Sequence, residues 1–257
     1  MPDEAVAEDA DDWAERAAVL FSDSDAGAYS YTPVQLGDIC IDVLLSNTQV
    51  WGSALHLSHW LVANAGVVAG RSVVELGAGA GLPSLVSARL GAASVVCTEV
   101  CDKALALLDE VAAHNELDGR LRSGKLDWFD ILNEVDGSWS VLPVELTIAA
   151  DCNYFSSAVP ALLATFRLVI APGGMLLLAS REERIGLTEC YDALLAEVDF
   201  ELLESITFGS EMGSWSSADD LSSARPAAHR GDAADAAARE ASSSAAHRLW
   251  VFRRRLV

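Results

Sequence analysis

The glycine-rich stretch at residues 72–82 constrains the fold of this chain more than any other feature. The apolar pair Val73 and Val74 predicts a buried strand, and a helical pattern begins at Pro83. Between them stand one acid and three alternating glycines: Glu75, Gly77, Gly79 and Gly81. Glycine admits backbone angles and close ligand approaches that a Cβ would block, and a helix N-terminus offers free N–H donors. Strand, glycine turn and helix together predict a nucleotide cradle in an α/β fold.

The spacing of the glycines narrows the choice of ligand. The dinucleotide fingerprint is G-x-G-x-x-G, whereas this chain has G-x-G-x-G with a carboxylate two residues ahead of the first glycine. That form is typical of enzymes that use S-adenosyl-L-methionine (SAM). The methionine end of SAM carries an ammonium that Glu75 can help hold, while a pyrophosphate needs bare N–H groups. Two alternatives stay open, namely NAD binding and a tight turn with no ligand.

Two later acids are candidates to bind the ribose and the adenine of the ligand. Glu99 ends an apolar run about twenty residues after the glycines, where an acid can accept hydrogen bonds from ribose hydroxyls. Its alternative role is to cap the helix that begins near Asp102. Asp127 and Trp128 follow a further strand; the acid can accept from an adenine amino group and the ring can stack on adenine. An ordinary surface tryptophan is the alternative for Trp128.

Several blocks of sequence are similar to one enzyme family. The chain resembles the seven-strand lysine methyltransferases of methyltransferase family 16, the group of the methyltransferase-like 21 and eukaryotic elongation-factor lysine methyltransferases. The resemblance covers roughly residues 30–208 and the last ten. The matching blocks are Val50–Leu61, Val74–Pro83, Thr98-Glu99, Asp151-Cys-Asn-Tyr154 and Leu176–Arg181. Glu99 stands where that family usually has aspartate.

The resemblance implies a fold, a cofactor and a set of site residues. The fold is a Rossmann-like seven-strand α/β/α sandwich, with a mostly parallel sheet and an antiparallel last strand. The cofactor is SAM, its product is S-adenosyl-L-homocysteine (SAH), and no metal is expected. Trp51 would lie at the wall of the SAM pocket, with simple core packing as the alternative.

The motif Asp151-Cys-Asn-Tyr154 is the candidate for catalysis. Methyl transfer from SAM is a direct displacement in which positioning supplies most of the rate. A lysine amine must also lose its proton, which a desolvated pocket favours. Asp151 follows a buried strand and can attract the incoming cation, while the Tyr154 ring can line the channel for methyl transfer. The alternative role for Asp151 is a helix N-cap.

Composition and charge limit the classes of partner. The chain has 257 residues, 51% of them hydrophobic, which is enough for one α/β core. No apolar run approaches a membrane span, and the acidic N-terminus is unlike a signal peptide. Five cysteines without metal spacing are typical of reduced intracellular thiols. We therefore expect a monomer in the cytoplasm, or alternatively the nucleus.

The net charge of −21 argues against a nucleic-acid substrate and favours a basic protein partner. The preferred function is methylation of a lysine side chain on a protein. Transfer to a small molecule or to protein arginine remains an alternative, because those enzymes would share the cofactor residues. A non-catalytic scaffold that binds a partner is the alternative from another class.

The chain divides into an acidic arm at residues 1–28 and a methyltransferase domain at residues 29–257. Residues 209–246 are rich in Ala, Ser and Asp and are predicted to be a flexible insertion. We expect a hairpin at residues 34–50, a helix at 51–65 and a turn at Pro172–Gly174 that leads into a strand. Core strands are predicted near residues 72–76, 93–98, 122–127, 145–150 and 174–180, followed by an antiparallel pair at 200–208 and 247–254.

Overall fold

A seven-stranded sheet forms the centre of the molecule in the computed structural model, which describes residues 29–45, 50–133, 143–152, 156–182, 186–208 and 246–256. The strand order is β5-β4-β3-β6-β7-β9-β8, and a separate hairpin pairs β1 with β2. The strands are β1 (Ser30–Leu36), β2 (Ile39–Leu45), β3 (Ser72–Leu76), β4 (Ser94–Glu99), β5 (Leu121–Lys125), β6 (Val144–Ala150), β7 (Ile170–Arg181), β8 (Phe200–Phe208) and β9 (His247–Arg254).

Strands β5, β4, β3, β6 and β7 pair in parallel, and β9 is antiparallel to both of its neighbours, β7 and β8. Strands β3, β4, β6 and β7 are mostly apolar and buried, as expected of parallel strands covered by helices on both faces, whereas the edge strand β5 (LRSGK) is polar and partly exposed. Strand β9 lies between β7 and β8 in the open sheet. The predicted fold class is confirmed, including the antiparallel last strand.

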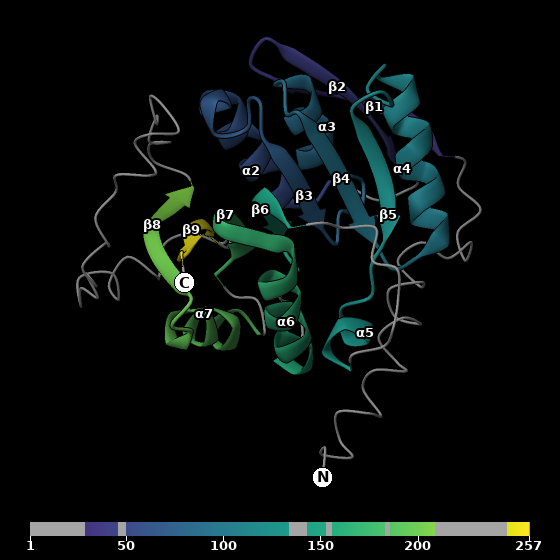
Figure 1. The fold of residues 1–257 in the computed structure, drawn as a ribbon. Coiled ribbons are helices and arrows are strands. Elements are labelled where there is room, and N and C mark those ends of the chain that lie inside the picture. The colour runs from purple at the N-terminus through teal and green to yellow at the C-terminus, as the bar shows by residue number, and fades with distance from the viewer. Residues whose placement is uncertain are drawn as a thin grey trace.

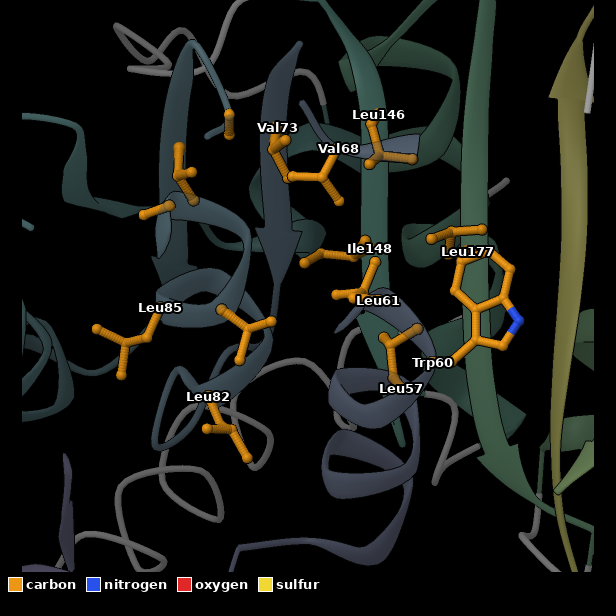
Figure 2. Close-up of a cluster of buried hydrophobic side chains, with 14 of the residues drawn as sticks. Leu57, Trp60, Leu61, Val68, Val73, Leu82, Leu85, Leu146, Ile148 and Leu177 are labelled. Atoms are coloured by element: carbon orange, nitrogen blue, oxygen red, sulfur yellow. The ribbon is translucent and has the colours of Figure 1, made fainter. Parts of the chain in front are cut away.

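Helices cover both faces of the sheet, which makes a three-layer sandwich (Figure 1). On one face lie α2, α3 and α4, and on the other lie α5, α6 and α7. Figure 2 shows the core between the sheet and the helices α2, α3 and α4. There Leu57, Trp60 and Leu61 of α2 pack over strands β3, β6 and β7. The helices are α2 (Gly52–Ala63), α3 (Leu82–Arg89), α4 (Asp102–His114), α5 (Trp128–Leu132), α6 (Val159–Val169) and α7 (Leu187–Ala196). Short 3-10 turns occupy Ala65–Val67 and Ser156–Ala158.

The strand order reverses between β3 and β6. From β3 the chain moves outward through β4 and β5, and it then returns to place β6 on the other side of β3. Ligands of open α/β sheets bind at the carboxyl ends of the strands at such a point. The glycine loop follows β3 and Asp151 follows β6, so both candidate motifs leave the sheet at this place.

Some predicted boundaries differ from the structure. The N-terminal hairpin begins at Ser30 and ends at Leu45, earlier than predicted. Pro172–Gly174 is not a turn ahead of a strand, because β7 already begins at Ile170 and pairs there with Val144. The pairing shifts register just after that point, and a Cβ on Gly174 would lie 2.9 Å from the carbonyl oxygens of Ala171 and Val144. Proline and glycine are thus accommodated in an irregular strand end.

The acidic arm at residues 1–28 lies outside the described residues, as does nearly all of the predicted insertion, residues 209–245. Both predictions therefore stay predictions. In the part of the chain that the structure describes, no helix combines the length and apolarity needed to cross a bilayer.

Candidate active site

The loop after β3 has the backbone that its glycines predict. Gly77, Gly79 and Gly81 have φ values of +59°, +55° and +71°, in the left-handed region where side chains are disfavoured. A Cβ on Gly81 would lie 2.5 Å from Cδ2 of Leu108, so this position is also closed sterically. A Cβ on Gly79 would meet nothing within 4 Å. The middle of the loop is therefore open to a ligand that approaches the backbone closely.

Glu75 lies beneath this loop and is buried. One carboxyl oxygen, Oε2, accepts a hydrogen bond of 2.9 Å from the backbone N–H of Ser84 in the first turn of α3. Burial raises the pKa of Glu75 to about 8, against the opposing effect of the Ser84 hydrogen bond and with a smaller contribution from the charge of Glu99. The carboxyl group is held at a helix N-terminus, where it can be neutral or charged near pH 8.

Glu99 is directed at the glycine loop. Its Oε1 accepts from the Gly79 N–H at 2.8 Å and its Oε2 accepts from the Val100 N–H at 3.1 Å. Burial raises the pKa of Glu99, and these two hydrogen bonds oppose the rise. The alternative role as a helix cap is wrong, because the N-cap of α4 is Cys101 and no side chain caps that helix. The ribose role stays a prediction.

Asp127 and Trp128 begin the short helix α5. The Asp127 carboxylate accepts from the Phe129 N–H at 2.9 Å and is the N-cap of that helix, and burial raises its pKa. Trp128 is only 3% exposed, so the surface alternative is wrong. A Cβ on Gly77 would lie 3.3 Å from the Trp128 ring, which places the ring against the glycine loop. Their role toward adenine remains a prediction.

Asp151 follows the last residue of β6 and is nearly buried. Its φ of +55° is left-handed, a conformation in which Asp is one of the tolerated side chains. Its Oδ1 accepts from the backbone N–H of Arg181 at 3.2 Å and from the Ser180 hydroxyl at 3.4 Å. Asp151 does not cap α6, whose N-cap is Ala158 with no side-chain cap. Tyr154 lies outside the described residues, so its role stays a prediction.

Trp51 is the N-cap residue of α2 and is 52% exposed, so the alternative of core packing is wrong. The next residue, Gly52, lies against β9, since a Cβ there would be 2.6 Å from Nε2 of His247. His247 pairs with Arg181 at the carboxyl end of β7. The start of α2 therefore lies at the same edge of the sheet as Asp151, while its contact with SAM stays a prediction.

Two contacts at the end of β3 were not predicted from the sequence. The Thr98 hydroxyl donates to the carbonyl of Glu75 at 2.6 Å, and the Cys152 thiol donates to the carbonyl of Leu76 at 2.9 Å. These side chains come from the two strands that flank β3. They satisfy carbonyls where the sheet ladder ends, just before Gly77. No pattern in the sequence could have indicated them, because the contacts depend on how three strand ends meet.

The described residues contain no group of three or more His, Cys, Asp or Glu side chains placed to hold a metal ion. What they offer is an open glycine loop with carboxyl groups beside it, which fits a ligand that carries hydroxyls and an ammonium. Asp151 adds a carboxylate at the neighbouring strand end.

Comparisons with known proteins agree with this arrangement. Residues 45–193, more than half of the chain, match the model of a family described as lysine methyltransferase. The chain is 28% identical over 155 residues to a protein-lysine N-methyltransferase EFM3 from Chaetomium thermophilum, covering 58% of this chain and 45% of that one. It is 30% identical over 133 residues to the EEF1A lysine methyltransferase 3 of Mus musculus, covering 52% and 55%. The chain thus spans about half the length of these relatives.

Among solved structures, the T. thermophilus 16S rRNA N2 G1207 methyltransferase, in complex with AdoMet and guanosine, matches with a TM-score of 0.51. The identity is 16%, and the match covers 88% of this chain and 50% of that one, so it supports the fold alone. The family model carries the assignment: this chain belongs to the lysine methyltransferase family.

Proposed function

We propose that this protein is a SAM-dependent N-methyltransferase that methylates a lysine side chain of a protein substrate. The observation that carries the proposal is the position of two motifs at the reversal point of the sheet. The glycine loop follows β3 and Asp151 follows its parallel neighbour β6, so the two leave the same edge side by side. Family membership and the names of the relatives, both of which are lysine methyltransferases, support the same class of acceptor.

The donor half of the proposed site uses the glycine loop and the carboxyl groups around it. Gly79 leaves room for close approach, Glu99 lies at the loop to accept from ribose hydroxyls, and Glu75 lies at the N-terminus of α3 to favour an ammonium. When SAM is bound, it supplies a methyl group on a sulfonium centre. Asp127 and Trp128 would border the adenine, and Trp51 would border the pocket from the start of α2.

The acceptor half uses the end of β6. Asp151 attracts the lysine ammonium, and the low-dielectric surroundings favour loss of its proton to solvent. With SAM bound, the amine lone pair would form the new N–C bond as the S–C bond breaks, and SAH would leave. Hydrogen bonds from Arg181 and Ser180 fix the direction of the Asp151 carboxylate. Positioning of this kind is the main source of rate in a displacement that needs no covalent intermediate. Tyr154 completes the motif and would line the channel.

The partners follow from charge and from the proposed acceptor. A chain with a net charge of −21 attracts basic proteins and repels phosphate backbones, so we propose a basic, lysine-bearing protein substrate. We propose that the enzyme acts as a monomer, without metal, in the cytoplasm or nucleus.

The experiment that tests this function uses SAM with a labelled methyl group and a cell lysate. The protein is added to one portion of the lysate, and an equal portion without added protein is the control. We expect label in one or a few protein bands, and SAH added in excess should suppress it. Label confined to small molecules would support the small-molecule alternative. Absence of any transfer from a protein that binds SAH would support the scaffold alternative.

A further inference from the structure

Cys152 occupies a position between the donor and acceptor halves of the proposed site. It follows Asp151 directly, is 3% exposed, and reaches from the end of β6 to the end of β3. Its thiol donates to the carbonyl of Leu76, the last residue of β3, at 2.9 Å. The carbonyl acceptor lies immediately before the first glycine of the loop.

The sulfur of Cys152 also lies close to the first glycine of the loop, Gly77. A Cβ built on Gly77 would lie 3.2 Å from Sγ of Cys152 and 3.3 Å from the Trp128 ring. Gly77 thus lies against both the thiol and the indole, in a left-handed conformation. On the other side of β3, the Thr98 hydroxyl donates to the carbonyl of Glu75. The strand end is therefore held from both neighbours where the loop begins.

We propose that Cys152 is a positioning residue that holds the cofactor loop and the Asp151 turn in register. This inference rests on the proposed function, because the two segments that Cys152 links are those proposed to hold SAM and the acceptor lysine. The left-handed backbone of Asp151 and that of Gly77 lie at the two ends of this link. A shift at either end moves the donor relative to the acceptor, and small misplacements of reactants cost rate steeply.

The Cys152 thiol stays protonated and can therefore remain a hydrogen-bond donor. Burial raises the pKa of Cys152 well above its ordinary value, and the nearby carboxyl groups of Glu75, Glu99 and Asp151 raise it further. The side chain therefore stays protonated at physiological pH and keeps its S–H for the Leu76 carbonyl. A protonated buried thiol is also a poor nucleophile, so we assign Cys152 no redox or covalent chemistry.

The test compares Cys152→Ala with Cys152→Ser and with the matched control Cys190→Ala. Cys190 is equally buried, lies in α7, and makes no hydrogen bond to the glycine loop. The first readout is the affinity for SAH, measured by calorimetry at a temperature where all variants are folded. We expect about a tenfold loss for Cys152→Ala, the scale of one lost hydrogen bond that leaves a buried carbonyl without its donor. Cys152→Ser keeps a donor and should recover part of the affinity, and Cys190→Ala should stay within about twofold of the wild type.

The second readout is amide hydrogen exchange in the loop, which needs no ligand. The N–H groups of Ala78, Gly79 and Gly81 are bonded to Thr98, Glu99 and Ala78. We expect these amides to exchange faster in Cys152→Ala than in Cys190→Ala. Equal SAH affinity and equal exchange in the two alanine variants would overturn the proposal and leave Cys152 as core packing. If the wild type binds no SAH, the proposed function fails, and exchange alone decides whether Cys152 orders the loop.

Discussion

Among single residues of the proposed site, Asp151 has an unusual backbone conformation. Asp151 is one of two non-glycine residues with positive φ among the described parts of the chain. Such conformations cost free energy and are often kept where a side chain must point in a fixed direction. The Arg181 N–H and the Ser180 hydroxyl complete this constraint on the Asp151 carboxylate. The residue is therefore best tested by a change that keeps its shape.

We expect Asp151→Asn to lower methyl transfer by at least about a hundredfold, the scale on which misplaced reactants lose rate. Asparagine tolerates the left-handed backbone and its amide oxygen can still accept from Arg181, so the fold should persist. The negative charge is lost. Transfer would be measured in single turnovers and SAH affinity by calorimetry. An equal loss of SAH binding, or full activity, would return Asp151 to a structural role.

A second prediction at this scale concerns Gly79, with Gly91 as the matched control. Both glycines have positive φ, +55° at Gly79 and +92° at Gly91, and at both a Cβ would meet nothing within 4 Å, so Gly91→Val introduces at least as much backbone strain as Gly79→Val. Only Gly79 lies in the proposed cofactor loop. SAH should raise the melting temperature of the wild type and of Gly91→Val by mass action, but not that of Gly79→Val. NAD should shift none of them; a shift with NAD alone would point to a dinucleotide site.

At the scale of elements, β3 and α3 are joined through Glu75, and this link depends on pH. The folded protein holds the Glu75 proton up to about pH 8, whereas the ordinary pKa is 4.5. Between these values the folded state binds more protons than the unfolded chain, so the contribution of Glu75 to stability falls as pH rises. Above pH 8 the buried carboxylate is charged and the loss is complete.

Glu75→Gln imitates the protonated acid and should remove this dependence. We expect little difference in unfolding free energy between variant and wild type at pH 5. At pH 9 the variant should be more stable by several kcal/mol, with an upper limit set by the shift in pKa. Urea unfolding at the two pH values measures this difference. A variant that is less stable than the wild type at pH 9 would contradict the account. Above about pH 8, where the wild-type carboxylate is charged, SAH affinity should be lower in the variant, because the ammonium lacks its anionic partner there.

The hairpin β1–β2 is attached to α4 by a different kind of link. Asn115, at the end of α4, accepts from the Asp42 N–H at 3.1 Å and donates to the carbonyls of Asp42 and Val111 at 2.7 and 2.8 Å. We expect Asn115→Ala to lower the unfolding free energy by about 2–3 kcal/mol, since it leaves buried groups without partners. Tyr31→Phe removes an exposed hydrogen bond to Glu110 and should lower the unfolding free energy much less than Asn115→Ala does. Equal effects in urea unfolding would show that Asn115 does not anchor the hairpin.

The sequence predicted some elements well and others poorly, for physical reasons. Strands β3, β4 and β6 were predicted closely because buried strands of this kind are mostly apolar runs bounded by glycine and polar turns. The start of β7 was missed because Pro172 and Gly174 normally end strands, whereas here Ile170, ahead of them, already pairs with Val144. The thiol contact of Cys152 and the Asn115 link could not be predicted, because each joins segments that only the folded sheet brings together.

In the whole molecule, we propose that donor and acceptor meet where the strand order of the sheet reverses. The two halves of the sheet supply different parts of the site, with the glycine loop and Glu99 on one side and Asp151 on the other. The strong negative charge of the whole chain favours a basic protein as the acceptor. Lysine, arginine and small-molecule acceptors would all be compatible with the donor half alone.

The most direct test is therefore the identity of the amino acid that receives the methyl group. Protein labelled from methyl-labelled SAM in a lysate would be hydrolysed completely, and the labelled amino acid would be identified by mass spectrometry. We expect methyl-lysine, with at least about a hundredfold less of it when Asp151→Asn replaces the wild type. Label in methylarginine, label only in small molecules, or equal methyl-lysine from the Asp151→Asn variant would contradict it.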